Sequence, residues 1–318
     1  MLSGVLAALG LPASALVLAL ARAGSVGALF VGFGTLLVRV VIARPVLARA
    51  DAAGGAARRR LAWMLGAALA VAAAATLAWL ASETAALADP DDWSATLAMI
   101  PTVLTGTEFG TLIAVRLALL VLIALAAVAG RSAIATALAA VAVVLQAGHL
   151  HAFAMVRGPS VLLASEVVHV FAAAAWLGAL PGLLVVVATL PAEPAGRAAA
   201  RFSPVGRAAV LAIAASAAWQ ARMLVGTLAG LLGTPYGWIC LAKLALFIAL
   251  LALAAENRFA LVPRLARDRT APAHLALLRG IACELVLGVA VVMLAALLGS
   301  GVTPPPVDVP PAAATHAT

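Results

Sequence analysis

Nitrogen, oxygen and sulfur side chains that can bind a metal gather at one point of a chain that is otherwise mostly Ala, Leu and Val. They are Gln146, His149, His151 and Met155 in the stretch QAGHLHAFAM, followed by Glu166 and His169 in SEVVH. Imidazole binds both Cu(I) and Cu(II), and a thioether selects Cu(I). Zinc would favour four firm nitrogen, sulfur or oxygen ligands. These residue types therefore indicate copper.

Helical spacing decides which of these side chains can meet. His149 and His151 are two residues apart and point to nearly opposite faces of an intact helix, so one of them can face the next helix. Glu166 and His169 share one helix face, and Trp176 lies further along the stripe of His169. The alternative is that each histidine is a hydrogen-bonded residue at the membrane interface. We predict a metal site with His149 and His169 as main ligands and with His151, Met155 and Glu166 as secondary ones.

The composition identifies the elements that must position this site. The chain has 318 residues, of which 65% are hydrophobic and 10% charged, and its mean hydropathy is +1.16. Apolar stretches of about 18 to 25 residues recur, and each is long enough for a helix to cross a bilayer. We predict an all-α polytopic transmembrane bundle. Its nine candidate helices lie near residues 3–21, 24–43, 61–81, 111–129, 132–153, 161–190, 208–231, 236–256 and 280–299.

The first candidate helix has a second interpretation. The residues Ala19-Leu20-Ala21 resemble a signal-peptide cleavage site, but no basic region precedes the apolar stretch. We expect a retained helix, and cleavage would leave eight helices without reversing any of them.

The net charge of +8 is a topology signal rather than a nucleic-acid footprint, because the arginines lie in short loops. Three such loops, near residues 44–60, 197–207 and 258–279, fall on one side of the predicted bundle. The acidic residues of 83–108 fall on the other side with Asp308. The positive-inside rule then places the N-terminus in the cytoplasm and the C-terminus in the periplasm.

The remaining segments are assigned by composition. Residues 82–110 are too polar to span and predict an external loop with a short interfacial helix, whereas the proline-rich tail 301–318 is typical of disorder. Residues 1–300 then form a single transmembrane domain. Cys240 and Cys283 lie inside apolar runs without metal-binding spacing, so we interpret them as packing residues.

Two segments of the chain resemble each other. Residues 107–119, TEFGTLIAVRLAL, and 234–246, TPYGWICLAKLAL, share Thr, an aromatic residue, Gly and a cation at identical spacing. This predicts a parallel internal repeat of residues 24–155 and 161–299, with the substrate path between the halves. The alternative is chance, because Leu and Ala matches are common in this composition.

Three charged residues lie inside the predicted spans, where a charge marks a functional site by default. Arg116 and Lys243 either extend to the outer interface or pair with a carboxylate such as Glu166. Glu284 either pairs with Arg279 or accepts a proton or cation on the inner side. We place these residues and Trp176 on the transport path or in charge pairing.

Several short motifs, taken in order, resemble the copper resistance protein D (CopD) family from about residue 107 to 306. The motifs are Thr107, Phe109-Gly110, Arg116, Gly148-His149, His169, Trp176-Leu177-Gly178, Arg201-Phe202-Ser203, Thr234-Pro235-Tyr236-Gly237, Lys243, Glu256-Asn257-Arg258, Pro263 and Glu284. The resemblance implies a bacterial inner-membrane protein of copper uptake and homeostasis. It also implies a periplasmic copper-binding partner of CopC type and a histidine pattern at His149 and His169. The chain departs from the family at Trp219-Gln220-Ala221-Arg222, and Arg222 would disfavour a bare cation nearby.

We therefore expect a copper permease, without enzymatic activity or an ATP-binding motif, that imports periplasmic copper through the lipid bilayer. Two other functions fit the same residues. Histidines on adjacent apolar helices can ligate haem in an electron-transfer protein, and a chaperone or assembly factor could bind copper without transporting it.

Overall fold

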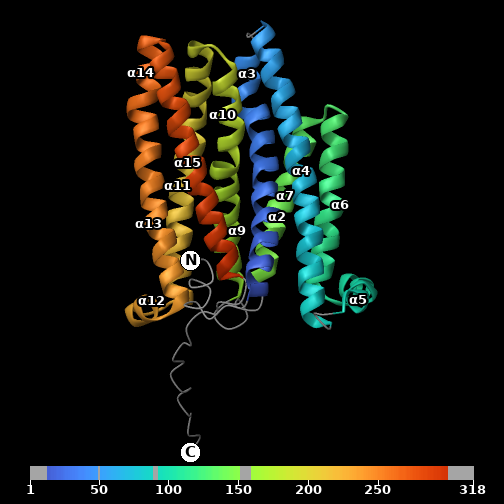
Figure 1. Ribbon diagram of the computed structural model, residues 1–318. Coiled ribbons are helices and arrows are strands. Elements are labelled where there is room, and N and C mark those ends of the chain that lie inside the picture. The colour runs from blue at the N-terminus through green and yellow to red at the C-terminus, as the bar shows by residue number, and fades with distance from the viewer. Residues whose placement is uncertain (1–12, 49–50, 89–91, 151–158, 300–318) are drawn as a thin grey trace, which may run out of the picture.

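The chain folds into a bundle of helices in a computed structural model that describes residues 13–48, 51–88, 92–150 and 159–299 (Figure 1). No strand occurs among these residues. The elements are α2 (Ala13–Leu37), η1 (Val38–Ala43), α3 (Arg44–Leu47), α4 (Asp51–Leu87), α5 (Trp93–Gly106), α6 (Glu108–Val128), α7 (Ser132–Val144), η2 (Leu145–Leu150), α9 (Pro159–Trp176), η3 (Leu177–Ala179), α10 (Leu180–Thr189), α11 (Ala192–Leu224), α12 (Leu228–Gly233), α13 (Pro235–Glu256), η4 (Asn257–Leu261), α14 (Val262–Asp268) and α15 (Ala271–Leu298).

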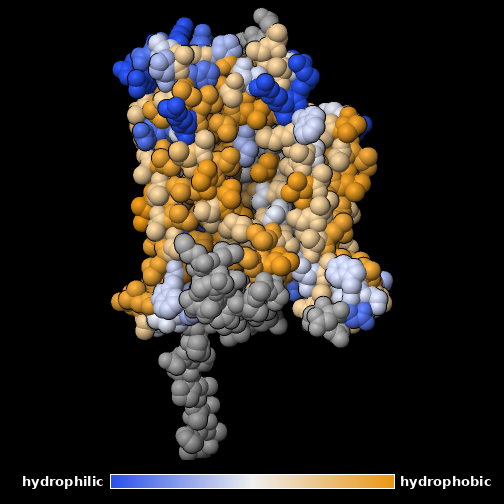
Figure 2. All heavy atoms as spheres, in the orientation of Figure 1, coloured by the Kyte–Doolittle hydropathy of each residue, from blue (hydrophilic) through white to orange (hydrophobic). Residues whose placement is uncertain are grey.

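The bundle is that of a multi-pass membrane protein. In the described part, seven helical segments are long and apolar enough to cross a bilayer: Ala15–Leu47, Ala52–Leu87, Glu108–Val128, Val161–Thr189, Ala192–Leu224, Pro235–Asp268 and Ala271–Leu298. The shorter apolar segment Ser132–Gly148 lies among them. Apolar side chains form a broad belt across the face of the bundle that Figure 2 shows. The predicted all-α polytopic fold is confirmed.

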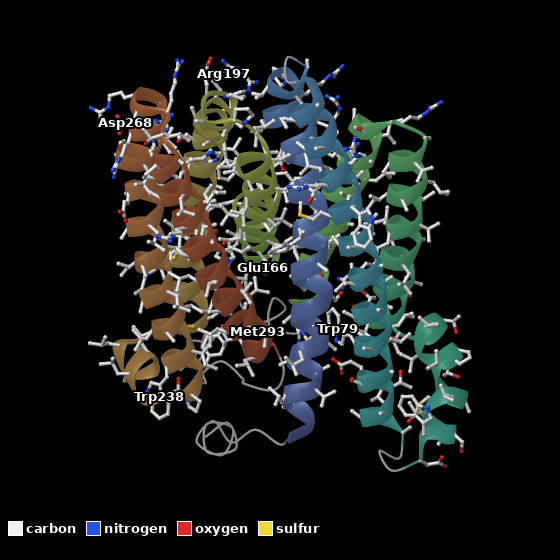
Figure 3. The ribbon with its side chains drawn as sticks, turned by 45° about the horizontal axis from the view of Figure 1, so that its top comes forward. Trp79, Glu166, Arg197, Trp238, Asp268 and Met293 are labelled. Atoms are coloured by element: carbon white, nitrogen blue, oxygen red, sulfur yellow. The ribbon has the colours of Figure 1, made fainter. Side chains whose placement is uncertain are left out.

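One end of the bundle carries most of the arginines, and we call it the arginine end. Hydrophilic side chains cover it in Figure 2, and Figure 3 places Arg197 and Asp268 there, with Trp238 at the opposite end. The three basic segments that the sequence predicts on one side thus lie at one end of the bundle. Successive spans run in opposite directions, so every second connection returns to the same end. The predicted short helix of the external loop is α5, which Asp92 caps at the opposite end by accepting from the Ser94 and Ala95 amides. Hydrogen bonds, first that of the Ser94 side chain, lower the pKa of Asp92 below its ordinary value.

The N-terminal prediction was wrong in one respect. The predicted reversal between residues 21 and 24 does not occur, because α2 is one continuous helix through this region. Arg22, expected in a loop, lies inside α2, donates to the Gly299 carbonyl at the end of α15 and lies 5.0 Å from the Trp79 ring. The prediction of a cytoplasmic N-terminus assumed that reversal. The first described residue, Ala13, instead lies at the end of the bundle where α15 ends, opposite the arginine end.

Several helix boundaries also differ from the prediction. The helix expected at 208–231 is α11, which begins at Ala192 and ends before Gly226, a residue with φ of 71°. The Ala- and Arg-rich ends of α4 and α11 are good helix formers and extend the helices past the apolar core. The helix expected at 161–190 contains one turn of 3₁₀ helix at Leu177–Ala179.

This 3₁₀ turn lies where α2 crosses the α9–α10 segment. A Cβ atom at Gly34 would overlap the backbone of Gly178, and a Cβ atom at Gly178 would overlap the carbonyl of Phe30. Small residues let membrane helices approach until their backbones touch. The crossing fixes the position of α9, which carries the candidate site, against α2.

The entrances to α6 and α13 have the same local geometry. Thr107 accepts from the Gly110 amide at 2.9 Å, and Thr234 accepts from the Gly237 amide at 3.0 Å. Each threonine hydroxyl also donates to a carbonyl four residues earlier. Each glycine packs so closely against the preceding short helix that a Cβ atom would overlap its backbone. These contacts explain why both segments share Thr and Gly at the same spacing.

We expect Gly34→Ala or Gly178→Ala to lower the free energy of unfolding by about 3 kcal/mol, because the added methyl group meets backbone that cannot move aside. Thermal unfolding in detergent micelles measures this effect. Gly66→Ala is the matched control, since open space surrounds that exposed helical glycine. It should raise stability by up to about 1 kcal/mol. Equal melting temperatures for the crossing variants and the control would contradict the tight crossing.

Candidate functional site

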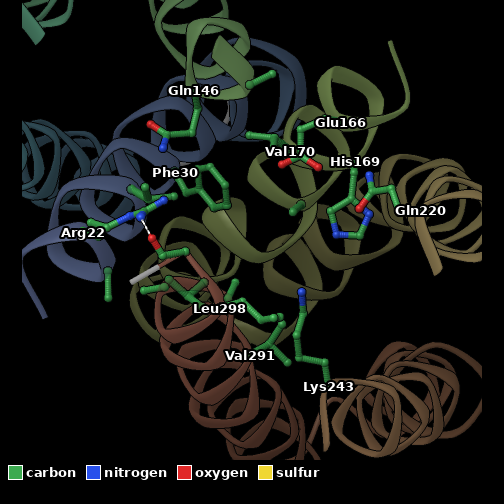
Figure 4. A pocket seen from close by; sticks show the side chains of 18 of the residues that line it. Arg22, Phe30, Gln146, Glu166, His169, Val170, Gln220, Lys243, Val291 and Leu298 are labelled. Carbon is green, nitrogen blue, oxygen red and sulfur yellow. Dashed lines mark hydrogen bonds between the residues drawn. The ribbon is translucent and has the colours of Figure 1, made fainter. Parts of the chain in front are cut away.

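A cavity of about 230 Å³ opens between α2, α9, α11, α13 and α15 (Figure 4). It lies toward the end opposite the arginines, because its lining includes Tyr236 at the start of α13 and Gly299 after α15. Its polar lining residues are Arg22, Gln146, Glu166, His169, Gln220, Tyr236 and Lys243. The predicted residues Glu166, His169 and Lys243 are thus brought together, from two helices far apart in the sequence.

A ladder of polar side chains joins α9 to α11 in the wall of this cavity. The Gln220 amide lies 3.5 Å from the Ser165 hydroxyl, and one turn away His169 Nδ1 lies 3.0 Å from Ser216 Oγ. Ser165 also donates to the Ser216 carbonyl at 3.2 Å. Residues four apart lie on one face of a helix, so the antiparallel pairs align. The ladder holds the His169 ring at a fixed place.

The hydroxyl of Ser216 determines the tautomer of His169. Ser216 Oγ donates its single proton to the Ala212 carbonyl at 2.6 Å, so toward His169 it acts as an acceptor. In this arrangement His169 Nδ1 carries the ring proton and donates it to Ser216, whereas the other tautomer would need the hydroxyl to turn away from Ala212. Because a neutral imidazole has one N–H, Nε2 keeps its lone pair. Metal-binding histidines are commonly held in this way, with the other ring nitrogen donating to a fixed acceptor.

Lys243 and Glu166 place opposite charges on two walls of the same cavity. Figure 4 shows the Lys243 side chain extending into the cavity from α13, toward the α9 wall that carries Glu166 and His169. Of the two predicted alternatives for Lys243, this position favours pairing with a carboxylate over extension to the outer interface. No ion pair closer than 4.0 Å joins the two residues among those that the described chain forms. The two charges face each other across space that a ligand could occupy.

Arg116 is placed differently from Lys243. Its side chain is 1% exposed, donates to Ser25 at 3.2 Å and to Gln146, and lies 5.3 Å from the Trp79 ring. Gln146, grouped above with the side chains that can bind a metal, here accepts a hydrogen bond from a neighbouring helix. Arg116 does not line the cavity, so its charge stabilises the packing of α6 against its neighbours.

The other predicted metal ligands cannot be placed from the described side chains. His149 belongs to the 3₁₀ turn η2, but its side chain lies outside the described part, as do all atoms of His151 and Met155. In the described part there is no group of three or more His, Cys, Asp or Glu side chains that could hold a metal. The five-residue ligand set therefore stays a prediction, with Glu166 and His169 as the members shown to line one cavity.

A second cavity of about 310 Å³ lies nearer the arginine end. Trp176 lines it, whereas the next residue, Leu177, lines the first cavity, so these two side chains stand between the cavities. Trp176 is 2% exposed and packs edge-on against Phe247. Glu284 lines the second cavity and accepts from the Asn257 amide. The predicted pair with Arg279 is absent from the described ion pairs, and Arg279 is exposed.

Sequence reasoning missed the partners of the predicted residues. Ser165, Ser216 and Tyr236 carried no role, and Gln220 was noted only as a departure from a family pattern. A recognisable signal exists, because Ser165 with His169 and Ser216 with Gln220 are polar pairs four residues apart on neighbouring helices. Arg222, expected to disfavour a cation, is exposed and does not line the cavity.

Nitrogen-15 NMR of histidine-labelled protein should show His169 with its proton on Nδ1. Ser216→Ala removes the acceptor, so we expect the tautomer to change or to become mixed. Ser216→Thr keeps a hydroxyl and should keep the wild-type signal. A His169 signal that is the same in all three proteins would contradict the assignment.

The comparisons with known proteins agree with the resemblance found in the sequence. The family model described as copper resistance protein D matches residues 196–298, and the model of the copper resistance protein D-like N-terminal domain matches residues 12–161. The second match extends the resemblance to the first hundred residues, where we had found only hydropathy. No significant match exists among the curated proteins or the solved structures. With both family models matched over most of its length, the chain belongs to the copper resistance protein D family.

Proposed function

We propose that the protein is a copper permease of the bacterial inner membrane, which accepts periplasmic copper at His149 and His169 and releases it to the cytoplasm. Membership of the family already indicates a role in copper resistance and handling. The observation that carries the finer proposal is the half-buried His169, whose Nδ1 is hydrogen-bonded to Ser216 and whose Nε2 is left to ligate a metal in a cavity.

The orientation follows from charge. With the arginine end in the cytoplasm, as the positive-inside rule requires, the cavity containing His169 lies in the periplasmic half of the bundle. The last described residues, at Gly299, then lie on the periplasmic side. A periplasmic copper-binding protein of CopC type is the partner that the family resemblance suggests for delivery to this side.

The charges in the cavity determine how tightly a copper cation is held there. Lys243 repels a copper cation, and the Glu166 carboxylate offsets this repulsion. A site of this kind binds copper without holding it permanently, which a transport path requires. His149, which follows Gln146 in the same 3₁₀ turn, is our proposed second ligand because Gln146 already lines the cavity.

The predicted repeat of residues 24–155 and 161–299 would account for a cavity in only one half of the chain. When the two halves are aligned with Gly34 opposite Gly178, Ser25 corresponds to His169, because each lies nine residues before its glycine. Ser25 bonds to Thr76 on α4 at 2.7 Å as His169 bonds to Ser216 on α11. In the first half the cation of the repeat, Arg116, reaches Ser25. In the second half Lys243 is shorter and leaves a cavity.

The direct test is copper flux into proteoliposomes that contain the full chain. We expect His149→Ala with His169→Ala to abolish uptake and to reduce the bound copper. His274→Gln is the control, because that histidine bonds to the Val187 carbonyl away from both cavities, and Gln can keep the hydrogen bond.

Two results would separate the competing functions. Copper binding at His169 without any flux in the wild type would favour a chaperone or assembly factor. A Soret absorption band lost in His169→Ala would favour a haem-binding electron-transfer protein.

The charge balance of the cavity gives a second prediction. Lys243→Met removes the repulsion and should tighten copper binding by about tenfold. Glu166→Gln should weaken binding by a similar factor, because the charge of Lys243 is then uncompensated. Isothermal titration with Cu(I) measures both effects, and Lys243→Arg, which keeps the charge, should bind no tighter than the wild type. Tighter binding in Lys243→Arg would contradict the electrostatic account.

A further inference from the structure

The cavity near the arginine end contains a carboxylic acid that the proposed copper ligands do not include. Glu284 is 4% exposed and lies in the middle of α15, a helix of mostly apolar residues. Among the described residues no cationic side chain forms an ion pair with it. An ionised carboxylate in the interior of a membrane protein is costly without such a partner. The protonated form avoids that cost.

The chain is built to hold one amide against this carboxyl group. Asn257 is 7% exposed and donates its side-chain NH₂ to Glu284. Gly280, one turn before Glu284, makes room for it, because a Cβ atom there would overlap the Asn257 side chain. Asn257 begins the π-helical turn η4, and π turns inside α-helices frequently occur at functional sites. These features fix a hydrogen-bond donor beside an acid that has no charge partner.

The other groups around Glu284 exclude a resident metal ion. Arg207 from α11 and Arg258 from η4 line the same cavity, and two guanidinium groups repel a metal cation. Arg258 donates to Ser203 and lies 5.4 Å from the Phe259 ring, so it is held away from the carboxyl group. The side chains that α9, α10 and α14 contribute to the cavity are Trp176, Leu180, Leu183 and Val262. On α15 itself, Arg279 does not line the cavity.

We propose that Glu284 is a proton-binding site, which holds a proton when the inner cavity is empty and releases it toward the arginine end when a copper cation passes Trp176. The O–H bond of the carboxyl group breaks, the proton leaves to water at the arginine end, and the carboxylate offsets one positive charge of the passing ion. The proton returns when the ion has left. The link to copper rests on the proposed function, whereas the proton binding itself does not.

Infrared difference spectroscopy of the reconstituted full chain tests the proton binding without any metal. A change of pH should produce a band from the C=O stretch of a protonated carboxyl group. We expect this band to be missing in Glu284→Gln and to remain in Glu256→Gln, the matched control, because Glu256 is an exposed residue next to Asn257. A band that is unchanged in Glu284→Gln would overturn the assignment.

Copper flux then tests the coupling. Glu284→Gln cannot form the carboxylate, so we expect uptake to fall by about tenfold while copper binding at the outer cavity stays at the wild-type level. Unchanged binding also shows that the variant folds. If it does not fold, Glu284→Asp keeps the acid and should shift the infrared band. Unchanged flux in a folded Glu284→Gln would overturn the coupling, whereas absent flux in the wild type would contradict the permease alone.

Discussion

A polar side chain inside this bundle is surrounded by apolar ones, so it must find a hydrogen-bond partner within the protein, and several find that partner on another helix. This constraint decides the arrangement of the interior. Arg116 reaches Ser25 and Gln146, His169 bonds to Ser216, and Asn257 bonds to Glu284. Each contact joins two helices distant in sequence, so each polar group also specifies which helices pack together. The site and the fold are therefore held by the same hydrogen bonds.

The same constraint separates structural polar groups from groups that are free to act. Arg116 donates to Ser25 and Gln146 within its half of the bundle and lines neither cavity. Lys243 and Glu166 face a cavity and form no ion pair with each other in the described part of the chain. A transport path needs side chains like Lys243 and Glu166. A side chain whose charge and hydrogen bonds are already fully paired within the protein gains no free energy by binding a passing ion. In the proposed transport path, Trp176 lies between the two cavities and is the bulky side chain that a passing ion would meet.

The sequence allowed the class of fold to be predicted, because apolar length and the position of the arginines follow directly from the physics of the bilayer. The predicted helices at 3–21 and 24–43 left Arg22 in a loop between them, because a charge between two apolar stretches is typical of a loop. Only the fold shows that the carbonyl of Gly299, after α15, accepts from Arg22. His169, Glu166 and Lys243 were found by type and depth. Ser216 and Gln220 were not, because a serine or glutamine near a helix end is common and its partner depends on how α9 and α11 pack.

X-ray absorption at the copper edge tests the central claim most directly. Copper-loaded wild-type protein and His169→Ala would be compared, with His274→Gln as the control for loss of an unrelated imidazole. The account predicts that copper in His169→Ala has one imidazole ligand fewer than in the wild type and that the control is unchanged. The same imidazole count and the same copper stoichiometry in wild type and His169→Ala would show that His169 is not a ligand.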